Sequence, residues 1–223
     1  MPDDLKVAQL LSSRICHDLV GPAGAVNAGL ELLEDGLSDA NAPIDLPALD
    51  LIKKSAGEST RRLAFFRIAF GFGAGAKGEA TFDQARELAA GFLAGGKVVL
   101  DWPEALESQP PGGVPASMVK VLLNMVLIAT EALPRGGTVG LNFAALDDGL
   151  GMAVLARGEG AALKDDICGS LAENAAADGL TARNVHGYLA QTLARGSGAL
   201  IEHSQGSDGE IQLAVMFPNA TDC

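Results

Sequence analysis

Apolar side chains recur at a helical spacing in two long stretches near the start of the chain. The first covers about residues 4–35 and the second about residues 47–70, and a connection rich in Gly, Pro, Asp and Asn (36–47) separates them. In the first stretch the apolar positions are Leu11, Ile15, Leu19, Pro22, Val26 and Leu33. The pattern predicts a hairpin of two helices. We expect a kink at Pro22, because proline removes one hydrogen bond from a helix.

A run of glycine and alanine follows the second predicted helix. The sequence Gly-Phe-Gly-Ala-Gly-Ala-Lys-Gly over 71–78 ends the helix and predicts a flexible linker. We therefore divide the chain into a helical hairpin domain at residues 1–76 and a second domain at residues 77–223. Two helices alone cannot bury both of their apolar stripes. We expect the hairpin to pair with that of a second copy, which makes the protein a homodimer held by a four-helix bundle.

Beyond the linker the pattern alternates between helices and short strands. The helices are predicted at 83–94, with Asp83 as the N-cap, and at 115–133 and 181–195. The predicted strands are 79–82, 97–102, 138–145, 150–156, 199–203 and 210–217. Turns at 147–149 and 206–209 join neighbouring strands as hairpins. We therefore expect an α+β sandwich, with helices on one face of a mostly antiparallel sheet.

Composition and charge narrow the classes of function. The chain has 16 Lys and Arg against 28 Asp and Glu, a net charge of −12, which argues against binding to nucleic acid. Its apolar fraction of 48% is too high for a disordered chain. We find neither an apolar run of about 18 residues nor the pattern of a signal peptide. Three widely spaced cysteines, Cys16, Cys168 and Cys223, indicate a reducing cytoplasm, without a disulfide framework or a zinc site.

The candidate chemistry lies in the first predicted helix, within the sequence Arg-Ile-Cys-His-Asp-Leu-Val-Gly-Pro (14–22). His17 is two positions from the apolar stripe, about 200° around the helix, and therefore faces solvent. A neutral imidazole is a good nucleophile towards a phosphoryl group, and the neighbouring Asp18 can fix its tautomer. We take His17 and Asp18 as candidate catalytic residues, and Arg14 and Gly21, on the same face, as candidate partner contacts. The alternative is an ordinary solvated His-Asp pair, with Arg14 in a surface salt bridge.

Two further residues receive a structural interpretation. Cys16 is expected to be a small buried apolar residue, although it adjoins the histidine. His186, on the last predicted helix, is expected to have a structural or surface role.

His-Asp-Leu-x-x-Pro on the first helix of a hairpin resembles the phosphoacceptor box of sensor histidine kinases. In that family the histidine is autophosphorylated and the following acid is the general base. The resemblance implies that the second domain is built like the ATP-binding domain of these kinases. Its helix 122–129 resembles their Asn-box, but Ile128 stands where the magnesium-holding asparagine belongs. Its segment 155–160 resembles their Asp-x-Gly-x-Gly box, but Ala156 replaces the adenine-recognising aspartate. Neither side chain can perform these roles, so the nucleotide site is expected to be degenerate.

A kinase-like scaffold without a nucleotide site resembles the ChpT-type histidine phosphotransferases. The resemblance extends over nearly the whole chain and is most specific at 14–22, 29–35 and 67–71. It implies that His17 takes phosphate from the receiver-domain aspartate of a hybrid histidine kinase and passes it to the aspartate of a response regulator. ATP would not be used, no autokinase activity is expected, and Mg²⁺ would be supplied by the receiver, so this chain would hold neither cofactor nor metal.

Two alternatives stay open. The chain could be an ATP-dependent histidine kinase with unusual nucleotide boxes, or a non-catalytic adaptor that only docks receiver domains. Because receivers are acidic around their own phosphorylation site, the charge of −12 argues against overall attraction as the source of docking. We expect the interface to rest on apolar helix surface and a few placed cations, with Arg14 among them.

Overall fold

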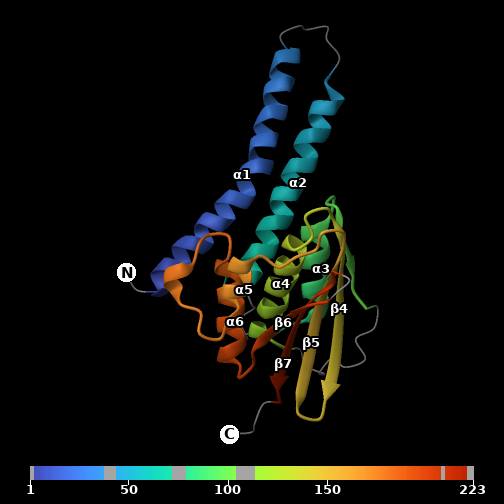
Figure 1. Cartoon of the computed structure of the whole chain (residues 1–223). Coiled ribbons are helices and arrows are strands. Elements are labelled where there is room, and N and C mark those ends of the chain that lie inside the picture. The colour runs from blue at the N-terminus through green and yellow to red at the C-terminus, as the bar shows by residue number, and fades with distance from the viewer. Residues whose placement is uncertain (1–2, 38–43, 72–78, 104–113, 207–208, 220–223) are drawn as a thin grey trace.

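The computed structural model describes residues 3–37, 44–71, 79–103, 114–206 and 209–219. Within these ranges two long helices form a hairpin whose lower end lies against an α+β domain (Figure 1). Residues 72–78 of the predicted linker, and Cys223, fall outside the described residues. None of the described helices is both long enough and apolar enough to cross a membrane.

The hairpin consists of α1 (Asp3–Leu37) and α2 (Leu46–Ala69). Asp45 is the N-cap of α2, and its carboxylate accepts a hydrogen bond of 3.0 Å from the backbone N–H of Ala48. Figure 1 shows that α1 changes direction part-way along its length, as expected for a helix that contains Pro22. The periodicity of apolar residues therefore predicted both helices to within about two residues at each end.

Much apolar surface on the hairpin stays uncovered within one chain. Both helices leave large apolar side chains at least two-fifths exposed, namely Leu5, Val20, Leu30, Leu32, Leu46, Leu49 and Leu63. The buried part of α2 is concentrated at its end, where Phe65, Phe66, Ile68 and Ala69 belong to the core of the second domain. One hydrophobic core thus runs from the foot of the hairpin into the α+β domain.

The second domain is built on a five-stranded sheet. Its strands are β2 (Val98–Asp101), β4 (Gly137–Leu146), β5 (Gly149–Arg157), β6 (Ile201–Gln205) and β7 (Ile211–Pro218). They lie in the order β2-β4-β5-β7-β6, and every neighbouring pair is antiparallel except β2 with β4. A separate two-stranded ladder joins β1 (Glu79–Ala80) to β3 (Val114–Pro115). The sheet is mostly antiparallel, as predicted.

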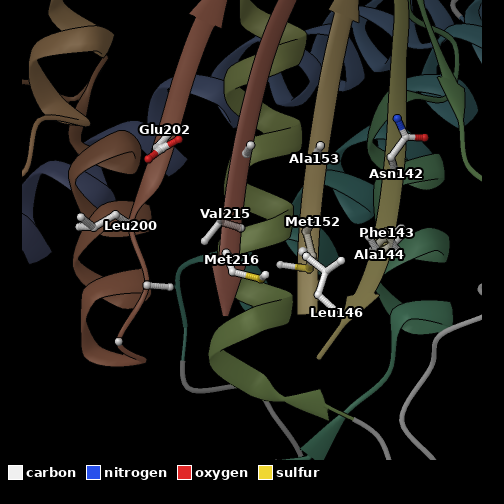
Figure 2. Close-up of a pocket in the computed structure, with 14 residues that line it drawn as sticks. Asn142, Phe143, Ala144, Leu146, Met152, Ala153, Leu200, Glu202, Val215 and Met216 are labelled. Atoms are coloured by element: carbon white, nitrogen blue, oxygen red, sulfur yellow. The ribbon is translucent and has the colours of Figure 1, made fainter. Parts of the chain in front are cut away.

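Helices cover one face of this sheet and leave the other open. They are α3 (Phe82–Leu93), α4 (Ala116–Glu131), α5 (Asp165–Ser170) and α6 (Val185–Gly196), with a 3₁₀ turn η1 (Ala177–Gly179). Figure 2 looks onto the open face, where small side chains such as Ala144 and Ala153 border a shallow hollow of about 500 Å³. The central helix α4 is buried along most of its length and contacts α2, α3, α6 and β5. The predicted α+β class is confirmed.

Two predicted helix starts were wrong. The N-cap of α3 is Thr81 and not Asp83, because the Thr81 hydroxyl accepts a hydrogen bond of 3.1 Å from the N–H of Gln84. The last helix begins at Val185, four residues later than the spacing suggested. Before it, the side chain of Asn184 accepts a 2.7 Å hydrogen bond from the N–H of Thr181 and holds a turn.

Candidate functional site

His17 projects from the outer side of α1. Its side chain is 84% exposed, whereas that of Asp18 is only 13% exposed. Nδ1 of His17 lies 3.0 Å from Oδ1 of Asp18. An ionised carboxylate can only accept a hydrogen bond, so the proton of a neutral imidazole belongs on Nδ1. The lone pair of Nε2 is then left on the solvent side, where a partner can reach it.

The second oxygen of Asp18 faces the protein. Nε of Arg14 donates a hydrogen bond of 3.0 Å to Oδ2 of Asp18. On the other side, Nη1 of Arg62 donates to the backbone carbonyl of Asp18 at 3.4 Å, and Nη2 of Arg62 pairs with Glu58 at 2.8 Å. The carboxylate beside His17 is therefore held on its inner side, and one oxygen is directed at the imidazole.

Arg14 lies on the side of α1 that the helical pattern gave it, but it is buried and not exposed. We expected a surface cation beside His17, but Arg14 is only 7% exposed, because this part of α1 packs against the second domain. Its Nη2 forms an ion pair with Oε1 of Glu131, and its Nη1 lies 3.3 Å from Nδ1 of His186. Burial works to lower the pKa of Arg14, but the charges of Glu131 and Asp18 outweigh it and raise the pKa. This geometry gives Arg14 a place inside the molecule and not on a docking surface.

Glu131 and His186 are the other members of the buried polar cluster around Arg14. The sequence alone did not assign either residue to the site. His186 on α6 is fully buried, and its Nε2 lies 3.3 Å from Oε2 of Glu131 at the end of α4. Burial works to raise the pKa of Glu131, but its contacts with His186 and Arg14 outweigh burial and lower the pKa. The available signal was Glu131 itself, the one acidic residue in the mostly apolar helix α4.

His17 lies between two hollows of the surface. One, of about 390 Å³, separates α1 from the second domain and is lined by Lys164 and Arg183, among others. The other, of about 420 Å³, lies along the hairpin and is lined by Gly21 and Arg62, among others. A Cβ atom built on Gly21 would meet no other atom within 4 Å, so the surface beside the imidazole is open, as the sequence indicated. Gly21 and His17 therefore face the same groove.

The two substituted nucleotide positions lie in the core. Ile128 and Ala156 are both almost fully buried and pack among apolar side chains. Asn124 is also buried, and its amide donates hydrogen bonds of 3.0 Å to the carbonyl of Ala69 and 2.8 Å to that of Lys120. Its amide nitrogen therefore links α4 to the end of α2. Among the described residues, no three His, Cys, Asp or Glu side chains gather where they could hold a metal ion.

Cys16 is a second correction. We expected it to be buried, but it is exposed on α1, one position from His17 on the side away from the packed face. Cys168 is partly buried, and both thiols are free. The burial prediction failed because it followed the average habit of free cysteine and not the position of Cys16 on the helix.

Comparison with known proteins shows which family this chain matches. The family model for the histidine phosphotransferase C-terminal domain matches residues 82–209, which is more than half of the chain. The chain belongs to the histidine phosphotransferase family. The match covers the second domain, so the substitutions at Ile128 and Ala156 lie inside the region by which the family is defined.

Two phosphotransferases among the similar proteins agree with this family. Protein phosphotransferase ChpT of Brucella abortus (strain 2308) is 39% identical over 143 residues, 64% of this chain. The match spans 63% of the length of the Brucella protein. A solved bacterial phosphotransferase is 31% identical and superposes over 95% of this chain and 96% of its own, with a TM-score of 0.78. The histidine kinase AdeS of Acinetobacter baumannii aligns over 92% of this chain and 98% of its own, at 12% identity and a TM-score of 0.45.

Proposed function

We propose that this chain is an ATP-independent histidine phosphotransferase and that His17 carries the phosphoryl group. The donor is the receiver-domain aspartate of a hybrid histidine kinase, and the acceptor is the aspartate of a response regulator. The observation that supports this most is the exposed imidazole whose Nδ1 lies 3.0 Å from a nearly buried carboxylate. Membership of the histidine phosphotransferase family gives the same reaction class.

The chemistry requires one nucleophile and one fixed carboxylate. The lone pair on Nε2 of His17 attacks the phosphorus of the donor's aspartyl phosphate, so that an N–P bond forms while the P–O bond to the donor breaks. The donor aspartate leaves as a carboxylate. Asp18 retains the proton on Nδ1 and balances the positive charge that develops on the ring. Transfer to the response regulator is the reverse step, with the regulator's aspartate as the nucleophile. Such transfer depends mainly on positioning and electrostatics.

The two hollows beside His17 suit a receiver domain with loops around its own aspartate. Lys164 and Arg183 are exposed at the border of the hollow between the domains, where they can face the acidic residues of a receiver. They replace Arg14, which is buried, as the candidate docking cations. Gly21 keeps the neighbouring groove open. Mg²⁺ would enter with the receiver, whose acidic side chains supply the oxygen ligands that this ion prefers.

A homodimer fits the uncovered apolar surface of the hairpin. The lower hairpin has a groove of about 570 Å³ lined by Leu11, Ile15, Leu63, Phe66 and Phe70. Leu11 and Ile15 belong to the apolar stripe that predicted a bundle. A second hairpin seated on this groove would complete a four-helix bundle. We place the dimer in the cytoplasm, as the cysteine pattern indicated.

The deciding experiment is phosphotransfer from a phosphorylated receiver domain. Wild-type protein is mixed with receivers of the source cell, and the His17→Ala variant is the matched control. Wild type should acquire acid-labile, alkali-stable phosphate, and the variant should acquire none. Full transfer by His17→Ala would contradict the proposal.

The two alternatives predict other outcomes of the same assay. An ATP-dependent kinase would label itself from Mg-ATP alone, and Mg-ATP would raise its melting temperature. An adaptor would bind receivers tightly without phosphate ever appearing on His17. We expect neither result, since Ile128 and Ala156 supply no polar group to a nucleotide.

A further inference from the structure

A chain of polar contacts leads from Asp18 into the second domain. The guanidinium of Arg14 is at its centre. One edge of this group donates to Oδ2 of Asp18 at 3.0 Å, and the opposite edge pairs with Glu131 and approaches His186. The side chain of Arg14 is 9% exposed, that of His186 is fully buried and that of Glu131 is 30% exposed, so these contacts are largely shielded from water. This series of polar contacts connects three helices: α1, α4 and α6.

The donors and acceptors in this series of contacts are consistent with one placement of the protons. Arginine can only donate, so Nδ1 of His186 must be the acceptor and the proton of that ring belongs on Nε2. This places the Nε2–H 3.3 Å from Oε2 of Glu131, within ion-pair distance but outside hydrogen-bond geometry. Glu131 thus faces His186 with one oxygen and Arg14 with the other. Each group fixes the orientation of the next, from the interior of the second domain out to Asp18.

Because Arg14 is held in place, the orientation of the Asp18 carboxylate is restricted. A solvated Arg–Asp pair four residues apart on a helix is weak, because both side chains sample several rotamers. Here Arg14 cannot swing away, since Glu131 and His186 hold its far edge. Asp18 in turn keeps Oδ2 on Arg14, and only Oδ1 is left for the imidazole of His17. The tautomer of His17, and with it the lone pair on Nε2, is therefore set partly from the second domain.

We propose that Arg14, Glu131 and His186 are positioning residues for phosphotransfer, acting on His17 through Asp18. The proposal rests on the assignment of His17 as the phosphoacceptor. It gives the second domain a part in the chemistry that needs no nucleotide. None of the three touches the phosphoryl group, so none is a catalytic residue. The competing interpretation is that the three residues only hold the hairpin against the second domain.

The first test reads the tautomer of His17 in the unphosphorylated protein. The chain has three histidines, so selective ¹⁵N labelling and ¹H–¹⁵N correlation spectra resolve each ring, with His17→Ala and His203→Ala variants for assignment. Wild type should show His17 with its proton on Nδ1. Glu131→Ala and His186→Leu should both shift the ring towards a mixture of tautomers. His186→Gln, which keeps an acceptor for Arg14 and an N–H group near Glu131, should restore the wild-type signal.

The matched control is an ion pair within the second domain. Its two residues are far from His17 in the sequence. Arg135 pairs with Glu159 at the surface, where both side chains are mostly exposed. Glu159→Gln should leave the His17 spectrum and the transfer rate unchanged. A wild-type tautomer signal in both Glu131→Ala and His186→Leu would overturn the proposal.

The second test measures the rate of phosphotransfer at saturating phosphorylated receiver. Glu131→Ala should slow transfer about 10-fold or more, the size of effect expected from misplacing a reacting group, while receiver binding stays within twofold. In an Asp18→Asn background, Glu131→Ala should cause no further loss, since its effect passes through Asp18. An equal loss in both backgrounds would indicate a purely structural role and would overturn the proposal.

The two proposals can fail separately. If wild type accepts no phosphate from any receiver, the assignment of His17 as phosphoacceptor fails, and the tautomer test still decides whether the three residues orient its ring. If wild type transfers phosphate and Glu131→Ala does so at the same rate, the positioning role fails and the phosphotransfer function stands.

Discussion

His17 and Asp18 are neighbours in sequence but lie in different environments. One residue turns an α-helix by about 100°, which is enough to place the imidazole in solvent and the next carboxylate against the protein. The imidazole is thus accessible, while the carboxylate beside it is held on the inner side by Arg14. A histidine and an aspartate placed three or four residues apart would share one face and one exposure. The adjacent pair is therefore suited to a phosphoacceptor that must meet two partners in turn.

Gly21 allows the open groove beside His17 to be tested. A Cβ atom at this position meets nothing within 4 Å, and alanine is favoured over glycine within a helix by about 0.5–1 kcal/mol. Gly21→Ala should therefore stabilise the chain by up to that amount, measured by urea unfolding. The added methyl group should slow transfer from a phosphorylated receiver several-fold. Gly36→Ala, equally open, should give a similar stabilisation with an unchanged rate. Unimpaired transfer by Gly21→Ala would remove Gly21 from the docking surface.

Glu131 makes stability depend on pH in a defined direction. Its folded-state pKa lies below the ordinary value of 4.5, because its contacts with His186 and Arg14 outweigh burial. The ionised carboxylate therefore contributes stability that is complete above about pH 4.5 and is lost as the pH falls through the lowered value. Wild type should exceed Glu131→Gln by about 1–3 kcal/mol at pH 7, and the gap should close towards pH 3. Chemical unfolding across this range measures it, with the exposed Glu159→Gln as control. A gap independent of pH would refute this account.

The sequence pointed to the candidate pair, His17 and Asp18, but not to the residues that support it. The position of His17 opposite the apolar stripe was enough to predict an exposed imidazole, and the adjoining carboxylate was enough to predict its partner. Helical geometry also put Arg14 on the side of His17, which was correct for its contact with Asp18. The burial of Arg14, however, depends on contacts with Glu131 and His186, which are more than 100 residues away in sequence. Local spacing carries no information about which helix packs over a given face.

Among the helices and strands, the long elements were predicted from the sequence and the short ones were not. Long periodic segments such as α1, α2 and α4 were predicted because each repeats its apolar spacing over several turns. The short elements α5, η1 and β3 were missed, since two to six residues are too few for a period to appear. The N-cap of α3 was predicted two residues too late, at Asp83 instead of Thr81, because the exact start of a helix depends on backbone direction. Fold class could be predicted because it depends on the order of the long elements.

The seam between α1 and α2 depends on one small residue. A Cβ atom on Gly29 would lie 2.6 Å from Cγ1 of Ile52 and 3.2 Å from the carbonyl oxygen of Ala48. Gly29→Ala should therefore force the helices apart and destabilise the chain by about 1–2 kcal/mol, because overpacking outweighs the gain in helix propensity. Gly24→Ala, in the same helix with nothing within 4 Å, should stabilise it. Urea unfolding of both variants measures the difference. Equal stabilisation of the two would show that the helices are not in close contact at Gly29.

The net charge of −12 and the uncovered hairpin together restrict how the molecule associates. Two copies carry the same charge and repel one another at long range, so a dimer must rest on apolar contact. The hairpin offers such contact, because it exposes large apolar side chains on both helices and the second domain covers only its lower end. That the two domains share one core could not be predicted from a glycine-rich boundary at 76, since the composition of a boundary carries no information about packing.

Leu63 is the place to test the dimer. It is half exposed on α2, lines the apolar groove with Phe66 and Phe70, and is not part of the domain core. A carboxylate there would be solvated in one chain alone but buried and unpaired in a bundle, at a cost of several kcal/mol. Leu63→Glu should therefore shift the mass measured by light scattering from twice 22.7 kDa to 22.7 kDa, without loss of melting cooperativity. Leu200→Glu, at an exposed leucine of the second domain, should remain dimeric. A wild-type monomer, or a dimer that tolerates Leu63→Glu, would require the exposed apolar face of the hairpin to have another occupant.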